Sequence, residues 1–314
     1  MHDRIRHELG GDEAGVLGDG VRPEPSRDDP PGETGGRVIG GQGPHAHDVA
    51  HPRLHEPCEN ASVARILALA NQKGGVAKTT SAVTLAACFA ERGQRVLVVD
   101  LDAQGCATFC LGLDPEDLDR TVADVVIGDP RLPVRAAIRA TGDGVDLLPA
   151  AVGLAAADQA LAGTRGREFV LRDALAPIAD DYDWIVLDCS PSLGIVTINA
   201  LTAADDVVVP LQCETLSHRG VGQLMETIRD VQRLTNPGLR IAGILPTLFD
   251  GRTSHARAVL DDLPTRYGVP VLRPISRSIR FAEAPATGRT VLATAGRSVG
   301  ARDYRAVADE LLQV

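Results

Sequence analysis

A chain of 314 residues is long enough to bury one substantial core or two small ones, so we expect a single α/β domain with additional segments. Its six cysteines are scattered without paired C-x-x-C spacing, which argues against a disulfide framework and a structural zinc site. No stretch approaches the roughly 18 consecutive apolar residues of a membrane span, and charges interrupt the N-terminus where a signal peptide is apolar, so we expect a soluble, cytoplasmic protein without membrane contact.

The net charge of −10 is distributed unevenly along the chain. Residues 1–62 carry 6 arginines against 12 acids, and residues 63–218 carry 12 basic against 21 acidic side chains. Residues 219–305 reverse the sign, with 14 arginines against 7 acids. A basic third within an acidic protein suggests a surface that faces a polyanion. Charge alone favours the alternative, that these arginines lie on ordinary solvated helix faces.

The first 60 residues are rich in Gly, Pro, Asp, Arg and His and show neither the helical nor the strand period. Runs such as DDPPGETGG cannot bury enough surface to order themselves, so we expect residues 1–62 to form a disordered tail. The alternative is a gene model that begins too early, with the true start near Val63, because no methionine after Met1 occurs before Met225.

From Val63 onward, short apolar runs alternate with helical stretches, which predicts that residues 63–314 form a doubly wound, mostly parallel sheet flanked by helices. The predicted strands are Ile66–Ala70, Val96–Asp100, Val145–Leu148, Trp184–Asp188, Val207–Pro210, Ile241–Leu245 and Val269–Leu272. The predicted helices are Thr79–Arg92, Arg167–Ala179, Ile195–Ala203, Val221–Leu234, Ser254–Tyr267 and Val299–Leu312.

Residues 71–80 (NQKGGVAKTT) join the first predicted strand to the first predicted helix, which is the context of a phosphate-binding P-loop. Such a loop surrounds phosphate with backbone N–H groups and the positive end of a helix, while a lysine reaches the outer phosphates and a hydroxyl binds magnesium. The sequence therefore predicts binding of ATP and Mg²⁺. The predicted loop residues are Lys73, Gly74, Gly75, Val76, Ala77, Lys78, Thr79 and Thr80.

Lys73 and Lys78 are the only lysines in a chain that contains 30 arginines. Where positive charge alone is needed this chain uses arginine, so the two lysines indicate positions that require a compact ammonium group. A surface turn with two incidental lysines is the weaker alternative in this strand–loop–helix context.

Two further predicted strands end in aspartates, in DLDAQG and DCSPS, at the edge of the sheet where open α/β proteins bind ligands. We assign Thr79 and Asp188 to the hydrated magnesium ion, Asp102 to the attacking water, and Asp100 to support of the site. A single aspartate after a strand is more often a helix cap, but three beside a phosphate loop favour function.

Gln72 and Ala77 replace the two glycines of the plain Walker pattern, and the loop resembles the deviant Walker A class, whose signature lysine is here Lys73. With VLVVDLDAQG, DWIVLDCSPSLGIVTINAL and RSIRFAEAPATGR, it forms an ordered motif set that resembles the ParA/Soj partition ATPases over about 250 residues. Relative to that family, Ala77 replaces glycine, which we expect to be tolerated only at negative φ. Ala103, Cys106 and Cys189–Ser190 are the other departures, and none removes a proposed ligand.

The resemblance implies an ATPase with weak intrinsic turnover, whose ATP form is a homodimer in which Lys73 acts on the partner's nucleotide and Lys78 on its own. It further implies non-specific binding of double-stranded DNA, a ParB-type centromere-binding partner that stimulates hydrolysis, and a nucleoid-associated location. Arg252, Arg277 and Arg280 lie where family members carry DNA-contacting arginines. The alternatives for these arginines are contact with the nucleotide or pairing with Glu283.

Several other functions fit the sequence less well. A MinD-like ATPase needs a basic amphipathic C-terminal helix, whereas this chain ends in the acidic YRAVADELLQV. An iron protein of the nitrogenase type needs cluster-ligating cysteines in glycine-rich loops, and a tyrosine autokinase needs a tyrosine cluster. A non-hydrolysing adaptor, or a relative that positions a protein or membrane cargo, remains open. Residues 1–60 show no helical period for a helix-turn-helix.

Overall fold

The computed structural model describes residues 63–214 and 217–313. The tail expected at residues 1–62 lies outside the described residues. The chain divides into two units, residues 1–49 and 50–314, and the described residues all belong to the second unit.

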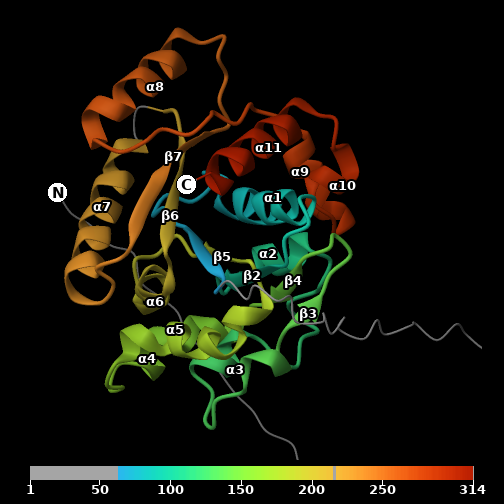
Figure 1. Cartoon of the computed structure of the whole chain (residues 1–314), viewed down its shortest axis with the longest axis vertical. Helices are drawn as coiled ribbons and strands as arrows, with labels where there is room; N and C mark the ends of the chain where they lie inside the picture. The colour runs from blue at the N-terminus through green and yellow to red at the C-terminus, as the bar shows by residue number, and fades with distance from the viewer. Residues whose placement is uncertain (1–62, 215–216, 314) are drawn as a thin grey trace, which may run out of the picture. The chain divides into compact units, whose positions relative to one another are not determined.

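The described residues form one seven-stranded sheet with the strand order β3-β4-β2-β5-β1-β6-β7 (Figure 1). Neighbouring strands are parallel except for the antiparallel edge pair β3 and β4. The strands are β1 (Arg65–Leu69), β2 (Val96–Leu101), β3 (Arg139–Ala140), β4 (Asp146–Leu148), β5 (Trp184–Cys189), β6 (Asp206–Gln212) and β7 (Arg240–Thr247).

Helices cover both faces of this sheet. The longer ones are α1 (Lys78–Ala90), α6 (Ile195–Ala203), α7 (Ser217–Leu234), α8 (Ser254–Tyr267) and α11 (Val299–Leu312). The shorter ones are α2 (Cys106–Cys110), α3 (Val122–Val126), α4 (Ala157–Ala160), α5 (Val170–Leu175), α9 (Arg280–Glu283) and α10 (Val291–Ala295). None of the helices in the described ranges is long and apolar enough to cross a bilayer.

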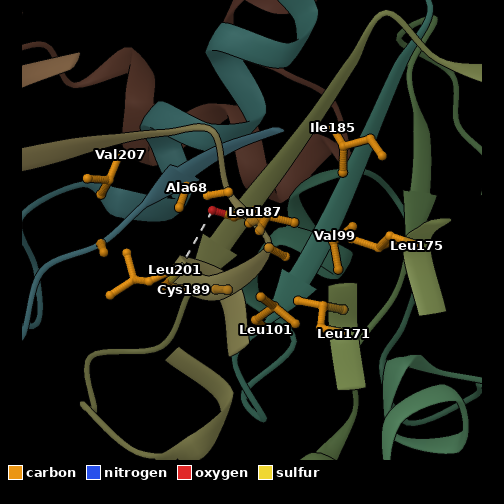
Figure 2. Close-up of a cluster of buried hydrophobic side chains, with 14 of the residues drawn as sticks. Ala68, Val99, Leu101, Leu171, Leu175, Ile185, Leu187, Cys189, Leu201 and Val207 are labelled. Carbon is orange, nitrogen blue, oxygen red and sulfur yellow. Dashed lines mark hydrogen bonds between the residues drawn. The ribbon is translucent and has the colours of Figure 1, made fainter. Parts of the chain in front are cut away.

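Successive side chains of the central strands point to opposite faces of the sheet, which produces two cores, one on each face. In β2, Leu97 and Val99 pack into the core beneath α3 to α7, whereas Val96 and Val98 pack into the core beneath α1, α10 and α11. Figure 2 shows the first core, where side chains of β1, β2, β5 and β6 meet those of α5 and α6. Both faces of the central strands are therefore buried, as expected for a parallel sheet between two helical layers.

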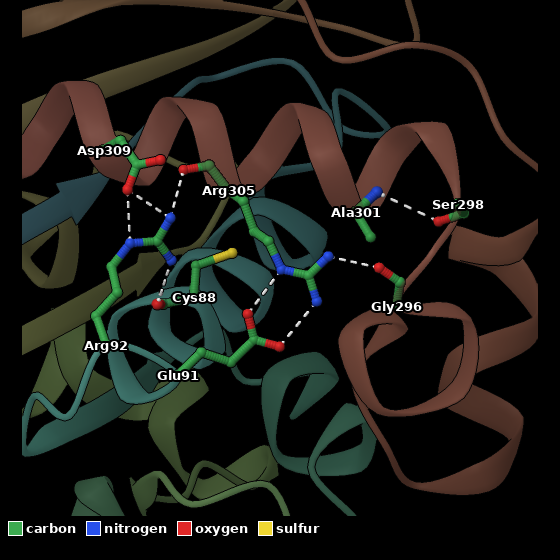
Figure 3. Close-up of polar contacts among 8 residues, drawn as sticks. All are labelled: Cys88, Glu91, Arg92, Gly296, Ser298, Ala301, Arg305 and Asp309. Carbon is green, nitrogen blue, oxygen red and sulfur yellow. Dashed lines mark hydrogen bonds and ion pairs between the residues drawn. The ribbon is translucent and has the colours of Figure 1, made fainter.

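Two arginines join the end of α1 to α11 (Figure 3). Arg92 binds Asp309 at 2.5 Å and also donates to the Arg305 carbonyl oxygen at 2.8 Å. Arg305 reaches back to the Glu91 carboxylate at 2.7 Å and 2.9 Å. These contacts fix the helix that follows the phosphate loop against the last helix of the chain.

The predicted fold class is confirmed, with corrections at particular elements. The segment Val269–Leu272 is not a strand; it makes only an isolated bridge to β7, because Pro270 has no N–H with which to extend the ladder. The predicted helix Arg167–Ala179 is broken into α5 and two flanking 3-10 segments, the second of which contains Pro177. The two-residue strand β3 was not predicted.

Candidate active site

The phosphate loop leaves β1, passes Lys73–Ala77, and enters α1 at Lys78. Gly75 has a φ of 75°, a conformation that glycine adopts without strain. A Cβ atom built at Gly74 or Gly75 would meet no atom within 4 Å, so neighbouring residues do not crowd these two positions. The structure thus places the predicted loop at the start of a 13-residue helix, where backbone N–H groups and the helix dipole attract anions.

Ala77 contradicts the expectation of a negative φ. Its φ is 61° and its ψ is 35°, so the residue that precedes α1 is in the left-handed region. A non-glycine residue there costs about 1–2 kcal/mol. The loop therefore keeps the backbone shape that glycine would give it, and the surrounding contacts hold the alanine in a disfavoured conformation.

Side chains from two strand ends anchor the loop. The Asn71 amide donates to the Pro210 carbonyl oxygen at 2.6 Å, and its Oδ1 accepts from the Lys73 N–H at 2.9 Å. The Thr247 hydroxyl donates to the Val76 carbonyl oxygen at 3.0 Å. The sequence placed Asn71 in the predicted loop without indicating its role. Thr247 was missed; it lies two residues beyond the predicted strand Ile241–Leu245, near the sheet edge where open α/β proteins bind ligands.

The two lysines have different surroundings. Lys78 is only 8% exposed, and its ammonium donates to the Lys73 carbonyl oxygen at 3.2 Å. Burial lowers the pKa of Lys78, while the nearby Asp188 opposes the shift. The Lys73 ammonium lies at the surface, 3.2 Å from the Glu214 carboxylate. Lys78 is therefore held inside the loop, whereas Lys73 is on its outer side.

Asp188 in β5 is fully buried, and neither of its carboxylate oxygens has a hydrogen-bond partner in the part of the chain that the structure describes. Burial raises the pKa of Asp188 well above its ordinary value, and the neighbouring Asp100 adds to the rise. The Thr79 hydroxyl and the Lys78 ammonium lower it from close by, although Thr79 completes no hydrogen bond to either oxygen. A buried, unpartnered carboxylate beside a hydroxyl suits a hard divalent cation.

Asp100 in β2 lies beside Asp188, because the two residues are register partners on neighbouring strands. Its Oδ2 accepts from the N–H and the hydroxyl of Thr108, each at 2.8 Å, and its Oδ1 accepts from the Asp102 N–H at 3.1 Å. Burial still raises the pKa of Asp100. These three donors suit Asp100 to a supporting position, and Thr108 is a partner that the sequence did not reveal.

Asp102 follows β2 and is half-buried at the same edge of the sheet. Its Oδ1 accepts from the Gln104 N–H at 3.0 Å, which forms a tight turn directly after the strand. The negative charge of Asp102 lies close enough to Lys78 to raise the pKa of that lysine, against the larger effect of burial. The predicted acids Asp100, Asp102 and Asp188 are therefore gathered around the phosphate loop.

The three predicted DNA-binding arginines are all exposed. The segments that carry Arg252 and Arg277 are joined by a bridge between Phe249 and Ser276, and both arginines lower the pKa of Asp250, mainly through its hydrogen bond to Arg252. Arg252 is 90% exposed. Arg280 pairs with Glu283 at 2.7 Å, as one sequence-based alternative expected.

Comparison with known proteins agrees with this geometry. The family model of an AAA domain matches residues 64–241. The sporulation initiation inhibitor protein Soj of Bacillus subtilis is 42% identical over 249 residues, covering 79% of this chain and 98% of Soj. The chromosome partitioning protein ParA of Caulobacter vibrioides is 40% identical over 256 residues, covering 81% of this chain and 96% of that protein.

A solved structure of cobyrinic acid a,c-diamide synthase from Mycobacterium smegmatis, with bound ADP and magnesium, is 50% identical. The match covers 80% of this chain and 94% of that chain, with a TM-score of 0.72. The chain belongs to the ParA/Soj family of P-loop partition ATPases.

Proposed function

We propose that this protein is an ATP-dependent switch that dimerises with bound nucleotide, coats DNA without sequence preference, and is discharged by a ParB-type partner during chromosome or plasmid partition. The observation that carries the proposal is the combination of two lysines in one phosphate loop with the buried carboxylate of Asp188, which has no hydrogen-bond partner among residues 63–214 and 217–313. A loop with a purely structural role would not require both the pair of lysines and the buried carboxylate.

The loop offers the elements that a nucleoside triphosphate needs. The backbone of Gly74 to Thr79 would surround the phosphates, and the Lys78 ammonium would turn from the Lys73 carbonyl oxygen to the outer phosphate oxygens. Thr79 and Asp188 would hold magnesium, partly through water. When bound, that ion neutralises charge on the phosphate oxygens.

Hydrolysis requires an oriented water molecule. Asp102 would position it, because its backbone is fixed by Asp100 and its turn by Gln104. Loss of the Asp102 carboxylate should leave nucleotide binding intact and slow the chemical step of hydrolysis.

Dimerisation would redirect the Lys73 ammonium from Glu214 towards the other subunit. The Lys73–Glu214 pair is solvent-exposed, with 33% and 55% of the two side chains accessible, so breaking it costs about 1 kcal/mol or less. The Lys73 ammonium would then reach the partner subunit's nucleotide. ATP occupancy and subunit contact would therefore depend on each other.

DNA binding would use Arg252, Arg277 and Arg280, which are exposed and can exchange their acidic neighbours for phosphates. Non-specific DNA binding is mainly phosphate neutralisation by such cations. Association with DNA would locate the ATP form on the nucleoid.

Two variants test the switch. Asp102→Ala should accumulate as an ATP-bound dimer, because binding is retained while hydrolysis slows, and Lys73→Ala should bind ATP as a monomer. Light scattering with ATP and with ADP measures both states. An Asp102→Ala protein that stays monomeric with ATP would refute the switch.

The 50% identity to the diamide synthase supports a second candidate, an ATP-dependent amidation in which the same loop activates a substrate carboxylate. Turnover would then depend on cobyrinic acid and an ammonia donor. Measuring phosphate release with that substrate and, separately, with DNA distinguishes the two functions.

A further inference from the structure

Thr247 is the last residue of β7, and its side chain is completely buried. Its hydroxyl donates at 3.0 Å to the carbonyl oxygen of Val76, a residue of the phosphate loop that lies 171 positions earlier in the chain. Thr247 is not among the residues that would bind phosphate, magnesium or the attacking water.

The contact fixes the orientation of one peptide plane. In a trans peptide the carbonyl oxygen and the following N–H point in opposite directions. Holding the Val76 oxygen towards Thr247 therefore directs the Ala77 N–H away from β7. That N–H belongs to the part of the loop that precedes α1.

Backbone strain is concentrated at the same contact. In the described ranges, the non-glycine residues with positive φ are Ala77, at 61°, and Leu248, at 50°. Each of them directly follows one partner of the Thr247–Val76 hydrogen bond. An alanine does not favour this conformation by itself, so an external contact must hold it.

We propose that Thr247 is a positioning residue, which orients the Val76–Ala77 peptide so that the Ala77 N–H faces the bound phosphate. This inference rests on the proposed nucleotide function of the loop. The end of β7 would thereby influence nucleotide affinity through the loop backbone, without contact between Thr247 and the nucleotide.

The test compares Thr247→Val, which removes the hydroxyl and nearly keeps the shape, with Thr247→Ser, which keeps the hydroxyl. The dissociation constant of a fluorescent ATP analogue with Mg²⁺ is measured at a temperature where all variants are fully folded. Thr247→Val should weaken binding about five- to tenfold, as expected for one lost hydrogen bond, and Thr247→Ser should restore it.

A second comparison uses Ala77→Gly, which removes the strain at residue 77. In that background the effect of Thr247→Val on affinity should shrink, so the two changes should be non-additive. Unchanged affinity in Thr247→Val, or strict additivity of the two changes, overturns the inference while the nucleotide function stands. A wild-type protein that binds no ATP analogue refutes the proposed function itself.

Discussion

Asp188 places a carboxylate in the protein interior, beside the buried carboxylate of Asp100, without a hydrogen-bond partner in the described ranges. Burying a charge in this way is unfavourable unless a cation compensates it. The raised pKa of Asp188 is consistent with that cost. A structural aspartate would have acquired donors, as Asp100 has from Thr108.

Replacing Asp188 with asparagine should therefore have opposite effects with and without ligand. Without nucleotide, the variant should unfold at a higher temperature, because a buried unpaired acid is removed. With ATP, magnesium should no longer add stability, and metal affinity should fall at least about tenfold. Thermal unfolding with ATP, with and without Mg²⁺, measures both effects, and a magnesium-dependent gain as large as that of the wild type would contradict the assignment.

At the scale of elements, the loop after α2 packs against the segment before α10 through two glycines. Gly112 has a φ of 89°, and a side chain built on it would lie 2.9 Å from the Gly288 carbonyl oxygen. This close approach joins the region that follows Asp102 to the segment that carries Arg280.

Gly112→Ala should destabilise the protein by about 2 kcal/mol or more, because strain and steric overlap add. Gly93→Ala is the matched control, since Gly93 has a φ of 81° but open space around it. It should cost only the conformational part, about 1 kcal/mol. Urea unfolding compares the two, and equal losses would show that the glycine contact is not tight.

The α1–α11 contact should be sensitive to acid. The hydrogen bond from Arg305 lowers the pKa of Glu91 below its ordinary value of 4.5, so its stabilisation is present above that pH and is lost as pH falls through the lowered pKa. Both side chains are partly exposed, so Glu91→Gln should cost only about 0.5–1 kcal/mol at pH 7. That cost should vanish in strong acid. A cost that does not change with pH, or an equal one from the exposed Glu116→Gln, would contradict this role.

The elements that could be predicted from sequence are those with long or fully apolar patterns. The helices Ile195–Ala203, Ser254–Tyr267 and Val299–Leu312 have the predicted bounds. Short helices such as α2 and α9 were missed, because four or five residues span little more than one turn and cannot show a repeating apolar pattern. The phosphate loop was recognisable because its residues are contiguous. Its anchors Asn71 and Thr247 act across strands, so only the folded chain shows their partners.

At the scale of the whole molecule, an acidic protein that binds DNA must do so through a local basic surface. Residues 219 to 305 carry 14 arginines against 7 acids, and Arg252, Arg277 and Arg280 of this segment are exposed. If three arginines in each subunit of a dimer neutralise phosphates, the logarithm of the binding constant should fall with the logarithm of salt concentration with a slope of about −5. Removing Arg252 and its symmetry mate should reduce that slope by about 2.

Co-sedimentation of the purified protein with double-stranded DNA, in ATP, in ADP and without nucleotide, across a salt series, tests the central claim most directly. The account predicts binding with ATP alone, weakening steeply as salt increases. Binding that is equal in all three nucleotide states, or no binding in any of them, would contradict a nucleotide-controlled DNA switch.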